Sequence, residues 1–139
     1  FGPHQHEEKF IPTIIRKLLN DEKVPVYGEG TNIRDWIYVT DHCEAIWKVL
    51  TKGKIGETYL VGANCEKSNL TIVMNICTAL NKNFSSSVEF VEDRAGHDYR
   101  YSIDPSKIQK ELNWKSKTPF NEGLFNTLKY YSEKLNYKV

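Results

Sequence analysis

The chain has 139 residues, of which 40% are hydrophobic and 27% are charged, values that suit one soluble globular domain. Its formal net charge of +1 provides no basic field for nucleic acid, and its apolar runs are too short to span a membrane. The three cysteines, Cys43, Cys65 and Cys77, form no C-x-x-C pair. This pattern argues against a disulfide scaffold or a zinc site and favours a reduced, cytoplasmic protein.

The first part of the chain alternates a helix with short strands. Apolar residues recur at helical spacing over residues 7–20, and a proline in this run is tolerated only near the first turn. The helix should therefore begin close to Glu8 or Lys9. Residues 24–27 form a short extended run that ends in a Gly-x-Gly turn. Residues 33–39 are rich in β-branched and aromatic side chains, which predicts a second strand.

Helices predominate in the rest of the chain. Asp41-x-x-Glu44 resembles a capping box, which predicts a helix ending near Gly53 that turns four apolar side chains to the core: Ala45, Ile46, Val49 and Leu50. The same criteria predict a strand over residues 57–62, a helix over 70–80, a loop over 81–87 and a strand over 88–91. After a loop over residues 93–100, they predict a helix that starts at Asp104-Pro105. A final helix over residues 120–135 carries four apolar side chains: Leu124, Phe125, Leu128 and Tyr131. This order predicts an α/β fold with α+β-like character, in which helices flank a small sheet.

Four segments concentrate charged and aromatic residues. Lys9 at a helix start suits an anion, although a solvated lysine is the commoner situation. Arg34 lies in an apolar strand, where it needs either an internal acidic partner or a phosphate. Asn69 or Thr71 fits a helix cap better than a ligand. Residues 93–101 place two arginines, a histidine and two tyrosines around a glycine, which favours a diphosphate clamp over a charged turn.

Seven segments follow one another in a distinctive order: Phe1-Gly2-Pro3-His4-Gln5, Glu8-Lys9-Phe10-Ile11-Pro12, Pro25-Val26-Tyr27-Gly28-Glu29-Gly30, Ile33-Arg34-Asp35-Trp36-Ile37-Tyr38-Val39-x-Asp41-His42, Gly56-Glu57-Thr58-Tyr59, Asp93-Arg94-x-Gly96-His97-Asp98-x-Arg100-Tyr101 and Leu112-Asn113-Trp114-Lys115. Their order and spacing resemble the dTDP-glucose 4,6-dehydratase family of the extended short-chain dehydrogenase/reductase superfamily. The resemblance covers essentially the whole chain. Two departures lie in loops: Ala95 stands where the family often has proline, and Ala63-Asn64-Cys65 replaces Gly-His-Asn.

The resemblance implies roles for twelve residues. Those that match the nucleotide pocket near the thymine are Lys9, Phe10, Pro25, Val26 and Tyr27. Arg34 matches a diphosphate ligand, and Asn69 matches an asparagine that contacts the substrate. Those that match the substrate-binding loop are Asp93, Arg94, Ala95, Gly96 and His97, with Arg94 and His97 close to the phosphates.

The family reaction is an internal redox cycle on dTDP-glucose. Bound NAD⁺ oxidises C4 of the sugar, water leaves across C5 and C6, and the hydride returns at C6 to give dTDP-4-keto-6-deoxyglucose. The family's NAD fingerprint and catalytic residues match positions upstream of Phe1, and this first residue is not methionine. We therefore expect residues 1–139 to be a C-terminal nucleotide-sugar-binding domain, without catalytic, cofactor-binding or metal-binding residues, and inactive without the N-terminal Rossmann half. A homodimer is an option for the intact enzyme.

Two other functions fit the same residues. The chain could be a stand-alone nucleotide-sugar-binding module, which would show no large exposed apolar surface. It could also be the C-terminal part of a UDP-sugar epimerase or decarboxylase, although the segment from Asp93 to Tyr101 argues against this alternative. The preference for one nucleobase would distinguish these functions.

Overall fold

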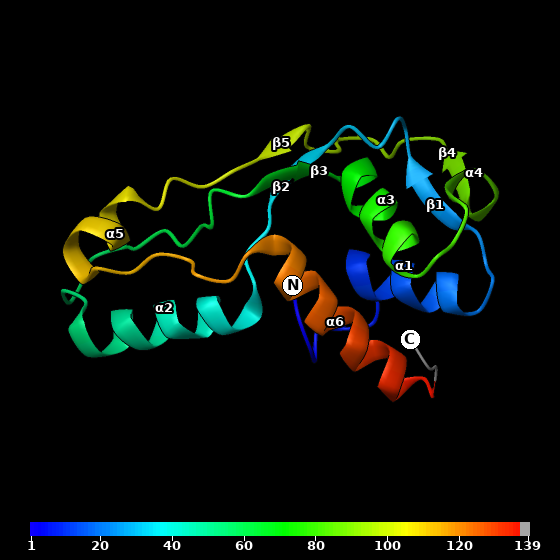
Figure 1. The fold of residues 1–139 in the computed structure, drawn as a ribbon. Coiled ribbons are helices and arrows are strands. Elements are labelled where there is room, and N and C mark those ends of the chain that lie inside the picture. Colours follow the sequence, from blue (N-terminus) through cyan, green and yellow to red (C-terminus); the bar gives the residue numbers. More distant parts are fainter. Residues whose placement is uncertain (137–139) are drawn as a thin grey trace.

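The computed structural model describes residues 1–136, and Figure 1 shows its elements. In chain order these are α1 (Phe10–Leu19), β1 (Val24–Tyr27), β2 (Ile33–Asp35), α2 (Val39–Lys52), β3 (Glu66–Ser68), α3 (Asn69–Ala79), α4 (Phe84–Ser87), β4 (Val88–Val91), β5 (Arg100–Tyr101), α5 (Ser106–Leu112) and α6 (Phe120–Lys134). None of the helices within residues 1–136 combines the length and the apolar character needed to cross a bilayer.

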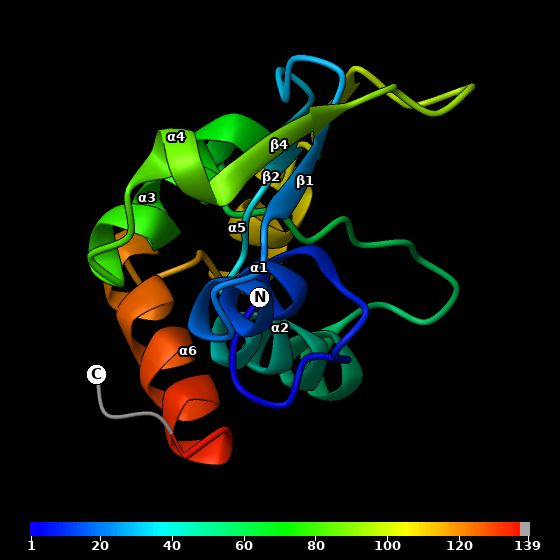
Figure 2. The same ribbon diagram turned by 90° about the vertical axis from the view of Figure 1, so that its right-hand side faces the viewer.

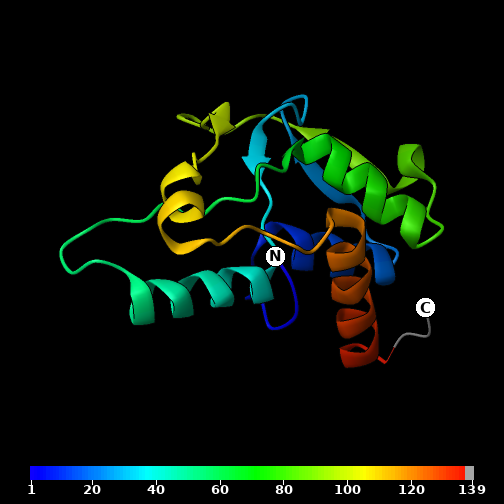
Figure 3. The ribbon, with the colours of Figure 1, turned by 60° about the vertical axis from the view of Figure 1, so that its left-hand side comes forward.

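The elements form two groups, each around its own apolar cluster. Figures 1 and 3 show α1, α3, α6, β1 and β4 together, while α2 and α5 lie to one side of them. The larger cluster takes its buried side chains from α1, β1, α3, β4 and α6. The smaller cluster has four buried members: Ala45, Ile108, Leu112 and Trp114. Burial of apolar surface therefore stabilises the first group more than the second.

Two small sheets are present in the described part of the chain. In one, β1 pairs in parallel with β4, with Val24 opposite Val88 and Tyr27 opposite Val91. In the other, β2 lies between β3, which is antiparallel to it, and β5, which is parallel to it. The expected fold class, a small sheet with flanking helices, is confirmed.

Helix α1 illustrates how the apolar pattern produces the fold. Four of its residues, Ile11, Ile14, Ile15 and Leu18, are at most 1% exposed, and they recur on one helical face as predicted. The helix begins directly after Lys9, which adopts an extended conformation. Proline in the first turn loses no intrahelical hydrogen bond, so Pro12 does not disturb it.

The strand predicted over residues 33–39 is shorter than expected. It ends at Asp35, and α2 begins at Val39 with Tyr38 as its N-cap. The predicted capping box at Asp41 and Glu44 is wrong, because the Asp41 carboxylate accepts hydrogen bonds from Ser116, Lys117 and Thr118 instead. The local pattern assigned the Asp41 carboxylate to the N-terminus of the helix. In the structure it instead accepts hydrogen bonds from a segment that is about 75 residues away in the sequence.

The predicted core face of α2 is also partly wrong. Ala45 is fully buried, but Ile46 and Leu50 are 54% and 75% exposed. The adjacent Trp47 is 65% exposed. The helix therefore buries one narrow stripe against α5 and turns further apolar side chains outward.

Other elements differ from the prediction at single sites. Residues 57–62 are not a strand, because nothing in the described part of the chain pairs with their backbone. The loop expected over residues 81–87 contains the helical turn α4. Helix α5 begins at Ser106 rather than Pro105, although Asp104 still accepts from the Ser106 amide. Phe125 on α6 is 63% exposed, outside the core.

Candidate functional site

A cavity of about 450 Å³ brings together segments that are distant in the sequence. It is lined from four places: the start of α1, strand β1, the first residue of α3, and the loop after β4. The lining residues are Glu8, Lys9, Phe10, Thr13, Ile14, Val24, Pro25, Tyr27, Asn69, Arg94 and His97. Seven of the twelve residues predicted for the site are in this set.

The parallel pairing of β1 with β4 explains why the two loops meet. In a parallel pair the carboxyl ends of both strands lie at the same edge. Figure 2 shows β1 and β4 side by side. The pairing continues one residue further, because the Gly28 amide donates to the Val91 carbonyl at 2.9 Å. The turn after Tyr27 and the loop after Val91 therefore start next to each other.

Three of the four residues of β1, Val24, Pro25 and Tyr27, line the cavity, and Val26 does not. Val26 is 2% exposed and belongs to the larger apolar cluster, whereas Pro25 and Tyr27 line the cavity. The expectation that Val26 lines the pocket is not met, because its side chain is buried in the larger apolar cluster.

The turn after β1 also positions Asn69. The Gly30 carbonyl accepts from the Leu70 amide at 2.8 Å, and the Asn32 carbonyl accepts from the Asn69 amide at 3.0 Å. Gly30 has a φ of +68°, and a Cβ there would lie 2.7 Å from Val26. Glycine is required at this close approach. The expected capping by Asn69 or Thr71 is wrong, since Ser68 is the N-cap and accepts from Thr71.

The loop after β4 supplies the cations of the site. The guanidinium of Arg94 lies 5.8 Å from the ring centre of Tyr27, within the range of a cation–π contact. His97 Nδ1 lies 2.7 Å from Asp93 Oδ1, and the same oxygen accepts from the Arg94 amide at 2.9 Å. The hydrogen bond from His97 lowers the pKa of Asp93 below its ordinary value. Asp93 is therefore ionised at neutral pH.

The cationic side chains of the site, Lys9, Arg34 and Arg94, form no ion pair within the described residues. Among residues 1–136, no carboxylate lies within 4.0 Å of the charged groups of Lys9, Arg34 or Arg94. The Arg94–Asp98 pair that would explain the loop as a charged turn is absent from this set. An unpaired cation beside an open cavity is available to an anionic ligand.

Four other predicted residues lie off the cavity lining. Arg34 donates to the Ile33 and Asp98 carbonyls at 2.7 and 3.0 Å, rather than to a carboxylate. Asp93 turns its carboxylate to its own loop, as described above. Ala95 and Gly96 are exposed at the tip of the loop. These four residues thus lie beside the lining set, Arg34 on β2 and the other three in the loop after β4.

Sequence reasoning missed four lining residues. Glu8, Thr13, Ile14 and Val24 also face the cavity. Helical spacing could have identified two of them, because Thr13 follows Lys9 and Ile14 follows Phe10 by four positions. Each pair lies on one face of α1.

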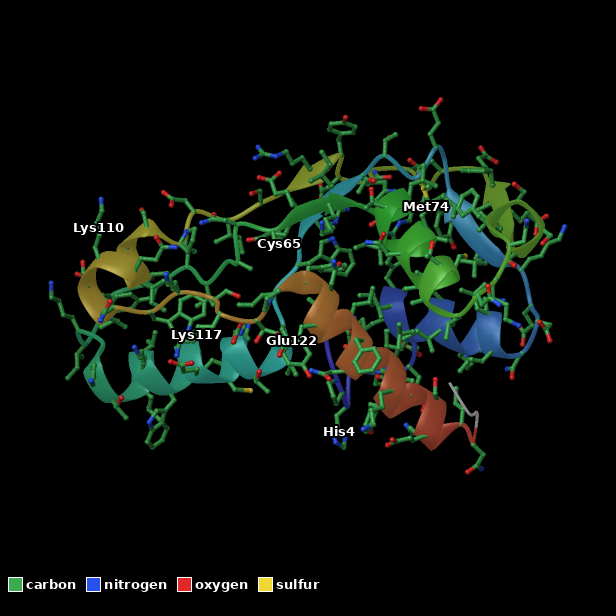
Figure 4. The ribbon with its side chains drawn as sticks, in the orientation of Figure 1. His4, Cys65, Met74, Lys110, Lys117 and Glu122 are labelled. Carbon is green, nitrogen blue, oxygen red and sulfur yellow. The ribbon has the colours of Figure 1, made fainter. Side chains whose placement is uncertain are left out.

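Asp35 is a further residue that the sequence did not mark. Its carboxylate accepts from the amides of Ala63, Asn64 and Cys65 at 2.9, 3.3 and 2.8 Å. This holds the loop before β3, where Figure 4 labels Cys65. No local pattern predicts three amide donors from a segment 28 to 30 residues away.

Comparison with known proteins shows which family the chain resembles over nearly its whole length. A dTDP-glucose 4,6-dehydratase of Mycolicibacterium smegmatis is 48% identical over 132 residues, which is 94% of this chain and 40% of that protein. The solved dTDP-glucose 4,6-dehydratase from Bacillus anthracis, in complex with NAD, has a TM-score of 0.91 and 43% identity over 98% of this chain and 43% of its own. The Streptomyces venezuelae enzyme DesIV, with NAD and TYD bound, has a TM-score of 0.94 and 40% identity over 98% of this chain and 42% of its own.

The chain thus spans about 40% of the length of the curated relatives that it matches. The sequence model of a family described as GDP-mannose 4,6 dehydratase matches residues 1–127. Because this match covers most of the chain, the protein belongs to that family of nucleotide-sugar dehydratases, and within it resembles the dTDP-glucose 4,6-dehydratases.

Proposed function

We propose that residues 1–139 are the C-terminal, nucleotide-sugar-binding domain of an NAD-dependent dTDP-glucose 4,6-dehydratase. The observation that carries this proposal is the cavity in which Lys9, Arg94 and His97 surround the apolar surfaces of Phe10 and Tyr27. Its volume of about 450 Å³ is within the range of small-molecule sites. The similarity to dehydratases with bound NAD and TYD supports the same substrate class.

The lining suits the two chemically different ends of a nucleoside diphosphate. Phe10, Pro25 and Tyr27 offer flat apolar surface for a pyrimidine base. Arg94 and His97 offer donors for the diphosphate, and Arg34 extends the cationic surface beside the same loop. Asn69 provides an amide that can donate and accept towards the ligand. Ala95 and Gly96 are exposed in the same loop, and we assign them to the part of its backbone that approaches the phosphates; Gly96 has a φ of +71°, a conformation that favours glycine.

The Gly28-x-Gly30 segment does not have the context of an NAD-binding fingerprint. Gly28-x-Gly30 is a turn between β1 and β2, and Gly28 packs against the Asp93 side chain. A dinucleotide fingerprint instead lies between a strand and a helix whose N-terminus faces the pyrophosphate. The proposal therefore assigns NAD and the catalytic groups to the N-terminal Rossmann half, and assigns to this chain the binding and orientation of the dTDP-sugar. The isolated chain should form no product.

An exposed apolar surface on α2 supports the proposal that this chain packs against an N-terminal Rossmann half. Ile46, Trp47 and Leu50 are 54%, 65% and 75% exposed on one side of the helix. Ile55 and Leu60 in the segment that follows are also exposed, and residues 57–62 form no strand in the described chain. Contiguous exposed apolar surface marks an interaction site. This pattern favours a domain of a larger protein over a stand-alone module.

Two finer assignments belong to the same proposal. The exposed Cys43 and the free Cys65 and Cys77 suit a reducing compartment, so we place the protein in the cytoplasm. A homodimer remains our expectation for the intact enzyme.

Ligand-observed NMR on the chain with dTDP, UDP and GDP tests the binding site. Saturation transfer to dTDP that is lost in Arg94→Ala and kept in Arg16→Ala would support the proposal. Arg16 is the matched control because it lies at the other end of α1, outside the cavity lining. Equal transfer to all three nucleotides would favour the UDP-sugar alternative, and no transfer to any of them would refute a nucleotide site on this chain.

A further inference from the structure

The carboxylate of Asp93 connects two cavity residues through one oxygen. Oδ1 accepts from the Arg94 amide at 2.9 Å and lies 2.7 Å from His97 Nδ1. The imidazole is 6% exposed, whereas the Asp93 side chain is 43% exposed and does not line the cavity. Asp93 is therefore placed to act on a ligand through its neighbours rather than by direct contact.

The turn after β1 leaves room for this carboxylate. Gly28 has a φ of +54°, and a Cβ built there would lie 3.2 Å from Asp93 Oδ2. That distance is tighter than an ordinary contact, so a larger residue at this position would crowd the Asp93 side chain. The Gly28 amide also anchors the end of β4 through the Val91 carbonyl. The position of Asp93 is thus determined by the strand pair.

Because the Asp93 carboxylate binds Nδ1 of His97, the other ring nitrogen, Nε2, is the one left for a ligand in the cavity. An ionised carboxylate accepts only, so Nδ1 carries the proton of this hydrogen bond. The side chains and backbone of residues 1–136 give Nε2 no partner, although His97 lines the cavity. When the ring carries a second proton, on Nε2, that atom can donate to a phosphate oxygen.

We propose that Asp93 is a positioning residue, which holds His97 with Nδ1–H directed at the carboxylate and presents Nε2 to the diphosphate. The role in ligand binding rests on the proposed function, but the orientation of His97 does not, because it exists in the free protein. Asp93 would then resemble the partners that orient histidines in metal sites and catalytic triads.

The orientation is tested first, without ligand. Long-range ¹H–¹⁵N NMR of the wild-type chain at neutral pH should show His97 with a protonated Nδ1. Asp93→Ala should lose this signature, Asp93→Asn should retain it in part, and Asp98→Asn should retain it fully. Asp98 is the matched control because its backbone carbonyl, not its side chain, makes the contacts in this loop. A His97 signal unchanged by Asp93→Ala would overturn the proposal.

A double-mutant cycle then tests the route to the ligand. We expect Asp93→Ala and His97→Ala each to weaken dTDP binding by about tenfold, and the double variant to be little weaker than either single one. Additive losses would mean that Asp93 contacts the ligand by itself, and would also overturn the proposal. If the wild-type chain binds no dTDP but His97 still shows a protonated Nδ1, the proposed function is refuted and the proposed orientation of His97 is not.

Discussion

Replacing Asp41 should destabilise the whole chain, because its carboxylate joins α2 to the segment that leads into α6. Oδ2 accepts from the Ser116 hydroxyl at 2.7 Å and from the Lys117 and Thr118 amides at 3.0 and 2.9 Å. Oδ1 accepts from the Thr118 hydroxyl at 3.1 Å. Asp41 is 6% exposed, and Figure 4 shows Lys117 above α2 on this segment.

The size of the effect follows from the two amides. Asp41→Ala leaves both partly buried amides without an acceptor and also removes the bonds to two hydroxyls, and leaving a buried group unsatisfied costs about 1–3 kcal/mol. We expect the free energy of unfolding to fall by about 3–4 kcal/mol, since some strain is relieved by local rearrangement. Asp41→Asn keeps one carbonyl oxygen and should cost about 1–2 kcal/mol.

Urea unfolding followed by tryptophan fluorescence measures these changes, because Trp114 lies in the adjacent apolar cluster. The control is Glu44→Ala, which removes only an ion pair to the exposed Lys117 and should change stability by at most about 0.5 kcal/mol. A loss in Asp41→Ala no larger than in this control would refute the reasoning.

The same residue predicts a pH dependence. Burial acts to raise the pKa of Asp41, but the Thr118 amide, the Ser116 hydroxyl and the other donors outweigh it and lower the pKa below 3.8. The stabilisation is therefore present above about pH 4 and is lost as the pH falls through the lowered pKa. The stability difference between wild type and Asp41→Asn should shrink over that acidic window in urea titrations.

Three further substitutions test other parts of the structure. Gly62→Ala should cost about 2 kcal/mol in urea unfolding, because its Cβ would lie 2.6 Å from Asp35 Oδ2 and 3.1 Å from the Ile103 carbonyl oxygen; an unchanged midpoint would show that the loop yields freely. Ile76→Ala removes a fully buried side chain and should lower stability by about 2–5 kcal/mol, against almost no change for the exposed Met74→Ala. Trp47→Gln should reduce concentration-dependent self-association in sedimentation velocity, with about 0.5 kcal/mol or less change in stability; unchanged association would argue against an interaction surface on α2.

Local pattern predicted most of the larger group of elements. The apolar stripes of α1 and α3 are long enough to define helices, and the short runs of β1 and β4 end at turn residues. These elements bury their stripes within residues 1–136, so the local preference and the tertiary structure agree. The prediction was weakest for α2 and residues 57–62, because several of their apolar side chains are exposed rather than packed against another element.

The candidate site was accessible to sequence reasoning mainly through its motifs. Residue type and order selected Lys9, Arg94 and His97, and the cavity brings these three together. Strand alternation would not have separated Val26 from Val24, which shares its face of β1 but lines the cavity. The neighbours of Arg34 were not predictable, because they are carbonyl oxygens of its own strand and of a loop 64 residues away.

The sequence by itself determined the helices with complete apolar faces, the two strands of the parallel pair, and the chemical types gathered in the loop after β4. Only the tertiary structure decided which donors bind two of the buried or half-buried carboxylates: the amides of the loop before β3 donate to Asp35, and the segment before α6 donates to Asp41. The physical reason is that periodicity reports which face of an element avoids water, whereas a hydrogen bond requires two groups within about 3 Å. That proximity arises only when distant segments of the chain pack together.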